Sequence, residues 1–168
     1  MEKQINQYKQ QEDGSWIGYT RNGEEFRFDN EDYERVIEYN WYLHKGNGYI
    51  ETHIYKENKK RTKLKIHRLI MNPPDNMQID HINHDKTDNR RQNLRICTNA
   101  ENQYNQSKRK DNTSGYKGVH WFKNMQKWTA QIWVNNKKIH LRCFDNLEEA
   151  TKAYKIAADK YFGEFASY

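Results

Sequence analysis

The chain has 168 residues, which is enough for one domain or two small ones. Only 35% of the residues are hydrophobic, but 14% are aromatic, which argues against disorder and predicts small cores built around Trp, Tyr and Phe. No apolar run approaches the roughly 18 residues that span a membrane, and the N-terminal stretch has no apolar secretory core. Cys97 and Cys143 form neither a CxxC pair nor a zinc-finger spacing, so we expect a cytoplasmic protein.

The charge of the chain is unevenly distributed. The formal net charge of +6 consists of −3 over residues 1–60, +6 over 61–110 and +3 over 111–168. A basic surface suits a polyanion, of which nucleic acid is the commonest, although a solvated basic face gives the same counts. A nucleic-acid partner is therefore expected to bind the last two thirds of the chain.

Residues 1–66 are predicted to form a small β-rich scaffold. The stretch 29–39 has an apolar stripe typical of a helix, with Asn30 as its N-cap. Residues 61–66 alternate as an edge strand does. Further strands are expected at 16–19, 25–28, 41–43 and 49–55.

Residues 114–168 are predicted to form a three-stranded antiparallel sheet packed on one helix, after a linker at 108–113. Asn146 can cap the helix, with Glu149 at the capping-box position, and Gly163 can end it. The strands are expected at 117–122, 128–134 and 137–144. Alternation predicts one polar face that holds Thr129, Gln131, Trp133, Lys138, His140 and Arg142.

The segment from Ile79 to Asn102 combines a carboxylate, an imidazole and amides. Cutting a phosphodiester needs a base that deprotonates water and a cation that stabilises the phosphate and the leaving oxygen. His81 can act as the base, while Asp80 and Asn102 offer the oxygen ligands that Mg²⁺ prefers. Adjacent strand residues point to opposite faces, so joining Asp80 with His81 requires the strand to end or twist, and Asn93 can hold the following loop closed.

The spacing of this segment predicts a hairpin followed by a helix. Strands are expected at 77–82 and 94–97, joined by a polar loop at 83–92. Thr98 and Glu101 form a capping box, so the helix should begin directly after Thr98.

The stretch from His67 to Asn105 resembles the HNH (ββα-metal) nuclease family, in the subgroup of phage and intron-encoded homing endonucleases. The motifs that match in order are His67-Arg68-Leu69, Asp80-His81-Ile82, Asn93-Leu94-Arg95 and Glu101-Asn102. The resemblance implies that His81 is the general base, that Asn93 pins the loop and orients the base, and that Asp80 and Asn102 bind one divalent metal ion. With Asn102 in place of a third His, the ion should be Mg²⁺, or else Mn²⁺, rather than zinc.

Other polar residues near the motif have less distinctive patterns. His67 could contact substrate or close a hydrogen bond within the fold, and the structural role is favoured. His84 and Asp85 are interpreted as polar loop residues.

Residues 114–166 resemble the plant ethylene-response-factor (APETALA-two) DNA-binding domain, which lays a three-stranded sheet in the major groove. The motifs that carry this resemblance are Ser114 to Val119, Lys127 to Ile132, Phe144 and Glu148-Glu149-Ala150. Homing endonucleases of the HNH type also carry this module. By position, the DNA-facing residues would be Lys117, His120, Phe122, Gln131, Trp133, Lys138 and His140.

Together these patterns predict an α+β protein. Its regions would be the scaffold at 1–66, the nuclease motif at 67–107, the linker and the DNA-binding domain at 114–168. The expected function is sequence-directed cleavage of double-stranded DNA by a monomer or homodimer that a phage or mobile element encodes, with no obligate protein partner. The alternatives are a non-cleaving DNA-binding regulator and, less favoured, an RNA-cutting enzyme, because the RNA major groove is too narrow for a sheet.

Overall fold

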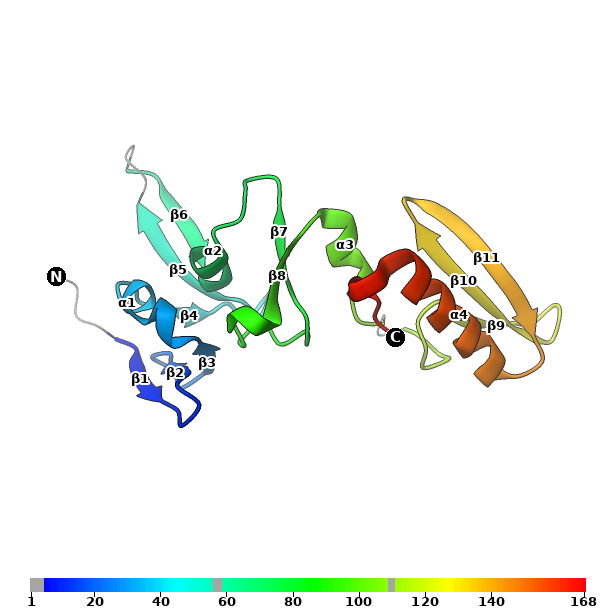
Figure 1. Cartoon of the computed structure of the whole chain (residues 1–168), viewed down its shortest axis with the longest axis horizontal. Coiled ribbons are helices and arrows are strands. Elements are labelled where there is room, and N and C mark those ends of the chain that lie inside the picture. Colours follow the sequence, from blue (N-terminus) through cyan, green and yellow to red (C-terminus); the bar gives the residue numbers. More distant parts are fainter. Residues whose placement is uncertain (1–4, 56–58, 109–110) are drawn as a thin grey trace. The chain divides into compact units, whose positions relative to one another are not determined.

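The computed structural model describes residues 5–55, 59–108 and 111–168. They belong to two compact units, an N-terminal unit (Met1–Cys97) and a C-terminal unit (Thr98–Tyr168). Each unit combines antiparallel β-structure with helices, so the α+β prediction is confirmed (Figure 1). Across these described ranges, no helix is both long and apolar enough to cross a bilayer. Residues 109 and 110 of the predicted linker lie outside the described residues.

The first sheet of the N-terminal unit has three strands, β1 (Gln7–Gln10), β2 (Trp16–Tyr19) and β3 (Glu25–Phe28), in that order. The alternation of apolar residues predicted β2 and β3, but not the polar β1. Gly18 in β2 faces the Phe26 ring of β3, where an added Cβ would come within 2.3 Å of a ring carbon. Only glycine therefore fits at this close approach.

The predicted helix at 29–39 is shorter than expected. It consists of a 3-10 turn, Asn30–Asp32, and one helical turn, α1 (Tyr33–Val36). The Asn30 side chain is not its cap, because its Oδ1 accepts a 3.0 Å hydrogen bond from the indole N–H of Trp16. A long-range partner thus replaces the local cap that the sequence predicted.

The second sheet has the order β4-β5-β6 and leads into a helix. Its strands are β4 (Tyr42–Leu43), β5 (Ile50–Tyr55) and β6 (Arg61–Lys65), with β6 at the edge as predicted. The following helix, α2 (Ile66–Met71), ends at Asn72, whose left-handed φ of 42° precedes two prolines.

A hairpin completes the N-terminal unit. Its strands are β7 (Gln78–His81) and β8 (Leu94–Cys97), and a 3-10 turn, Arg91–Asn93, enters β8. One apolar core joins this hairpin to both sheets and to α2. The buried side chains of this core are Phe26, Phe28, Val36, Trp41, Ile50, Ile66, Ile70, Ile79 and Leu94.

The C-terminal unit begins with α3 (Asn99–Tyr104), which starts at the predicted capping box of Thr98 and Glu101. Its sheet has the order β11-β10-β9, and α4 packs on one face of it (Figure 1). These elements are β9 (Val119–Phe122), β10 (Lys127–Val134), β11 (Lys137–Phe144) and α4 (Leu147–Phe162).

Local signals set both ends of α4, as predicted. The Asn146 side chain accepts a 2.8 Å bond from the Glu149 amide, and Gly163 follows the last helical residue with φ +53°. A second glycine, Gly118, precedes β9 at φ +66°, where an added Cβ would come within 2.4 Å of the Gln131 carbonyl oxygen. The 3-10 turn Gly163–Phe165 closes the unit.

Candidate functional site

The polar loop between β7 and β8 is held closed by Asn93, as the sequence predicted. The side-chain oxygen of Asn93 accepts a 2.9 Å bond from the backbone N–H of Asn83. Its side-chain nitrogen donates a 2.8 Å bond to the backbone carbonyl oxygen of Asp88. Asp88 in turn binds the Arg90 guanidinium through both of its carboxylate oxygens, at 2.8 Å each. Hydrogen bonds from Asn93 and Asp88 therefore cross-link the loop.

His81, at the end of β7, is oriented by a residue that sequence reasoning missed. Its Nε2 lies 3.2 Å from Oδ1 of Asn89, which is fully buried. The Asn89 amide is itself fixed, because its nitrogen donates to the Thr87 carbonyl oxygen at 3.0 Å. Oδ1 therefore accepts from His81, which places the imidazole proton on Nε2 and the basic lone pair on Nδ1.

Burial keeps the His81 imidazole neutral. The side chain is 5% exposed, and loss of solvation lowers its pKa, although the hydrogen bond to Asn89 and the nearby Asp80 carboxylate oppose the change. A neutral imidazole can accept a proton at neutral pH.

Asp80 lies directly opposite Arg95 in the hairpin. Its Oδ2 accepts two bonds from the guanidinium of Arg95, at 2.9 and 2.7 Å. The pairing of β7 with β8 stays regular through His81, so the strand does not break between the two residues. Regular pairing directs the two side chains to opposite faces of the hairpin. The Tyr49 ring lies 5.9 Å from that of His81, and burial and the Asp80 charge both raise the pKa of Tyr49.

Three rings pack together at this point. The His67 ring lies 5.1 Å from that of His81 and 5.0 Å from that of Tyr49, both edge to face. His67 is 4% exposed, burial lowers its pKa to about 2, and its Nδ1 has no hydrogen-bond partner in the described residues. His67 thus supports the base by ring packing rather than through a hydrogen bond at Nδ1.

The expected metal ligands belong to different units, Asp80 to the N-terminal unit and Asn102 to the C-terminal one. Asn102 is partly exposed in α3, and its backbone N–H donates to the Thr98 carbonyl oxygen at 3.1 Å. One carboxylate and one amide oxygen suit Mg²⁺, which keeps several of its waters. Among the described residues, no group of three or more His, Cys, Asp or Glu side chains forms a metal-binding cluster.

Six of the seven predicted DNA-facing residues share one face of the C-terminal sheet. In the register, His120 pairs with Thr129, and Trp133 pairs with Lys138. Because directly paired residues point to the same side, these side chains lie opposite the core face that packs on α4. The six residues, which we call the outer face, are His120, Phe122, Gln131, Trp133, Lys138 and His140.

Lys117 does not belong to the outer face. It precedes β9, and its Nζ donates a 2.9 Å bond to the carbonyl oxygen of Tyr104, the last residue of α3. Burial of the ammonium group lowers its pKa to about 8. The strand predicted at 117–122 begins two residues later because Gly118 turns the chain there.

A β-bulge between Ala130 and Gln131 shifts the predicted alternation of β11. Beyond it, Cys143 pairs with Thr129, and the Cys143 sulfur lies 3.4 Å from the Thr129 hydroxyl. Cys143 therefore stands on the polar side where the sequence placed Arg142.

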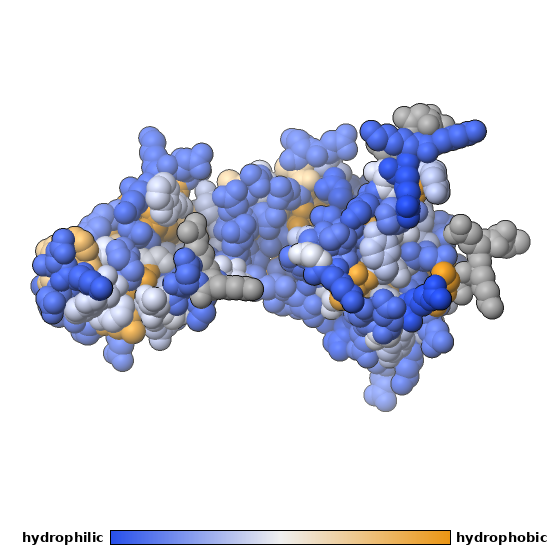
Figure 2. All heavy atoms as spheres, turned by 180° about the vertical axis from the view of Figure 1, so that it is seen from behind, coloured by the Kyte–Doolittle hydropathy of each residue, from blue (hydrophilic) through white to orange (hydrophobic). Residues whose placement is uncertain are grey.

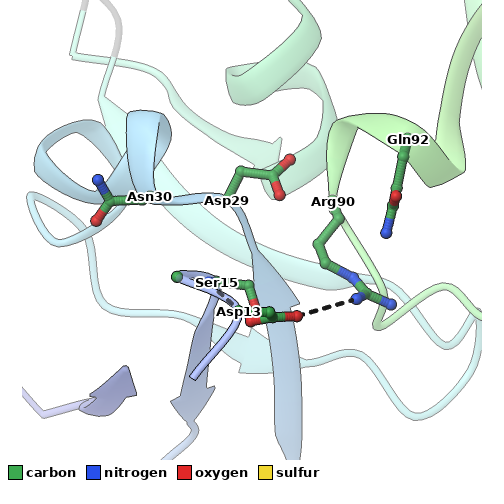
Figure 3. Close-up of a pocket in the computed structure, with 7 residues that line it drawn as sticks. Asp13, Ser15, Asp29, Asn30, Arg90 and Gln92 are labelled. Carbon is green, nitrogen blue, oxygen red and sulfur yellow. Dashed lines mark hydrogen bonds and ion pairs between the residues drawn. The ribbon is translucent and has the colours of Figure 1, made fainter. Parts of the chain in front are cut away.

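A surface pocket of about 390 Å³ lies on the N-terminal unit, and Figure 3 shows the Asp13 side chain directed toward Arg90 across it. The carboxylate and guanidinium are 4.0 Å apart. Asp29 also lines the pocket, and its carboxylate accepts a 2.6 Å bond from the backbone of Arg91. The charged groups here bind one another, which indicates a structural contact between the first sheet and the loop.

Figure 2 shows one side of the molecule, on which hydrophilic side chains predominate and hydrophobic ones form small, separate areas. The large exposed hydrophobic side chains include Trp133, at 58%, and Phe122, at 40%. Both belong to the outer face, which also holds Lys138 and two histidines.

Known proteins resemble this chain in the region of the hairpin and beyond it. A family model described as HNH endonuclease matches residues 65–104. An uncharacterized HNH endonuclease of Acanthamoeba polyphaga mimivirus is 29% identical over 138 residues, which span 79% of this chain and 67% of the relative. Protein 3.8 of Escherichia phage T7 is 32% identical over 95 residues, or 56% of this chain and 78% of the relative.

Proposed function

Since this chain belongs to the HNH endonuclease family, we propose that it hydrolyses phosphodiester bonds of double-stranded DNA with His81 as the general base. The observation that carries this proposal is the burial of the His81 imidazole, which is 5% exposed and whose Nε2 lies 3.2 Å from Asn89 Oδ1. A base needs a pKa that leaves it unprotonated at the working pH and a fixed tautomer, and this environment supplies both.

In the proposed reaction, Nδ1 of His81 takes a proton from water as the water oxygen bonds to phosphorus and the bond to the 3′ oxygen breaks. Asn89 keeps the proton on Nε2, while Asn93 acts at a distance by holding the loop. Asp80 and Asn102 would hold the divalent ion, with Arg95 orienting the Asp80 carboxylate. When bound, Mg²⁺ or Mn²⁺ stabilises charge on the phosphate and the leaving oxygen.

The C-terminal unit would position the enzyme on DNA, as its resemblance to the ethylene-response-factor domain suggests. The outer face supports this role because it combines basic and aromatic side chains on a sheet that can enter the major groove. Lys117 would contribute mainly by tying β9 to α3. Cleavage of the homing type, by a protein that a phage or mobile element encodes, fits the two viral relatives.

The decisive experiment incubates supercoiled plasmid that carries candidate phage DNA with the protein, in Mg²⁺ and in EDTA. We expect metal-dependent conversion to open-circular or linear DNA. His81→Ala should lose about a thousandfold in rate, within the range for a general base, and keep its DNA affinity. His53→Ala, which removes a histidine that stacks on Tyr42 away from the three-ring cluster, is the matched control.

An active His81→Ala protein would exclude the proposed base. A wild-type protein that shifts DNA in a gel but never cuts it, with any target supplied, would favour a non-cleaving regulator.

A further inference from the structure

Two lysine ammonium groups lie over the ring of Tyr49, close to His81. Lys65 Nζ is 4.1 Å and Lys86 Nζ is 4.5 Å from the centroid of the Tyr49 ring. That centroid is 5.9 Å from the centre of the His81 imidazole. Lys65 is the last residue of β6, and Lys86 lies in the polar loop, so two separate segments bring positive charge to one ring.

No carboxylate pairs with either lysine in the part of the chain that the structure describes. Lys86 Nζ donates one bond, of 2.8 Å, to the Asn47 carbonyl oxygen, which leaves it two further donors. The Glu51 carboxylate, which attracts Lys65, is itself bound by Lys63 at 3.2 Å and by the Asn47 side chain at 2.9 Å. Glu51 therefore offsets the Lys65 charge only in part, and the Lys86 ammonium has no carboxylate partner among the described residues.

The electrostatics of the pair favour an anion. Burial lowers the pKa of Lys65, the Glu51 charge opposes this effect, and the charges of Lys86 and Arg68 lower the pKa further. The Tyr49 ring attracts both cations but carries no net charge that could cancel their repulsion. An anion that contacts both ammonium groups would remove this repulsion.

We propose that Lys65 and Lys86 form a phosphate clamp that holds one backbone phosphate of the DNA substrate beside His81, with the Tyr49 ring as its support. This inference rests on the proposed nuclease function, which supplies the phosphodiester. Ammonium groups bind phosphate oxygens through charge-assisted hydrogen bonds. The clamp would fix the DNA backbone relative to the imidazole, so both lysines are positioning residues that also bind substrate.

The test compares Lys65→Met, Lys86→Met and the double variant with Lys9→Met, which removes the same charge from an exposed site on β1. Fluorescence anisotropy of a labelled duplex in EDTA gives the salt dependence of binding, and cleavage in Mg²⁺ gives the rate. Each clamp variant should lower the salt slope, which is the slope of the logarithm of the binding constant against the logarithm of the salt concentration, by about one unit. It should also lower the cleavage rate about tenfold to a hundredfold, because charge-assisted bonds to the phosphate are lost.

Because both lysines hold the same phosphate, the double variant should lose less than the product of the two single losses. If the wild type cuts DNA but the clamp variants behave like Lys9→Met, the clamp is wrong and the nuclease stands. If the wild type binds without cutting, and the clamp variants still lose slope, the nuclease is wrong and the phosphate site stands. A wild type that binds no DNA at low salt overturns both.

Discussion

The two units bury different kinds of side chain. Among the described residues, twelve buried polar or charged residues lie in the N-terminal unit, including the carboxylates of Asp32, Glu51, Asp80 and Asp88. The C-terminal unit has three, Asn105, Thr129 and Thr151, none of which is charged. Burying a charge costs free energy unless the charge is paired. The stability of the N-terminal unit therefore depends on specific ion-pair and hydrogen-bond partners, whereas that of the C-terminal unit depends mainly on apolar packing.

This difference matches the proposed division of labour. Proton transfer needs groups whose pKa values are shifted, as burial shifts those of His67 and His81, whereas reading DNA needs polar groups that face outward. This contrast can be tested with variants that remove one partner of a buried charge. Such variants should lower the stability of the N-terminal unit alone.

The largest effect on stability is expected for Arg91→Met. Arg91 binds both carboxylate oxygens of the fully buried Asp32, at 2.9 and 2.8 Å, and donates to the Ile70 carbonyl oxygen. Its loss leaves a buried carboxylate for which Arg35, at 3.3 Å, is the one remaining cationic partner among the described residues, so the N-terminal unit should lose about 3 kcal/mol. Chemical denaturation followed by unit-resolved NMR measures this loss.

Arg142→Met is the matched control, because Arg142 is exposed on β11 and its removal should cost under about 0.5 kcal/mol. If Arg91→Met destabilises both units equally, the two units do not differ as described.

The next effect is a loss of N-terminal stability in acid, caused by His67. Its folded pKa of about 2 lies below the unfolded value of 6.5, so below pH 6.5 the unfolded chain binds a proton that the folded one does not. Stability therefore falls as the pH drops from 6.5 toward 2, by about 2 kcal/mol at pH 5. His67→Phe, which keeps the ring packing, should remove this part of the acid dependence.

The measurement is the unfolding free energy at pH 7 and pH 5 for both proteins. His81, whose pKa burial also lowers, contributes with the same sign and stays in the variant. An identical acid slope in wild type and His67→Phe would mean that His67 is protonated in the folded state.

A smaller effect, on catalysis, is expected from Asn89. Asn89→Leu removes the acceptor that fixes the His81 tautomer, so the cleavage rate should fall about tenfold to a hundredfold. Asn89→Asp restores an acceptor and adds a negative charge that raises the pKa of His81. The pH–rate profile of this variant should therefore keep its height but shift its acidic limb to higher pH. Equal losses in both variants, without a pH shift, would reduce Asn89 to a structural role.

Sequence reasoning succeeded where local hydrogen bonds decide the structure. The capping box at Thr98 and the end of α4 at Gly163 both depend on residues within a few positions of one another. The order of the sheet and helix in the C-terminal unit also followed from alternation and from one apolar stripe.

Sequence reasoning failed where distant segments meet. Asn89 is one of several polar residues in its loop, and what distinguishes it is a 2.8 Å bond from its backbone N–H to the carbonyl oxygen of Arg27 in β3. Lys65 and Lys86 likewise come together only at the ring of Tyr49, which lies far from either in the chain. Such contacts depend on how the sheets pack, which the periodicity of one segment does not encode.

The smallest effect is expected on the C-terminal unit, from Lys138→Ala. Lys138 is exposed and pairs with Trp133 on the outer face, so its removal should weaken DNA binding severalfold and lower the salt slope by about one unit without changing stability. Lys152→Ala removes the same charge from an exposed position on α4, behind the sheet, and should leave the slope unchanged. Anisotropy over a salt series separates the two. If Lys152→Ala lowers the slope and Lys138→Ala does not, DNA contacts the helix side of the unit, and the outer face is free for another partner.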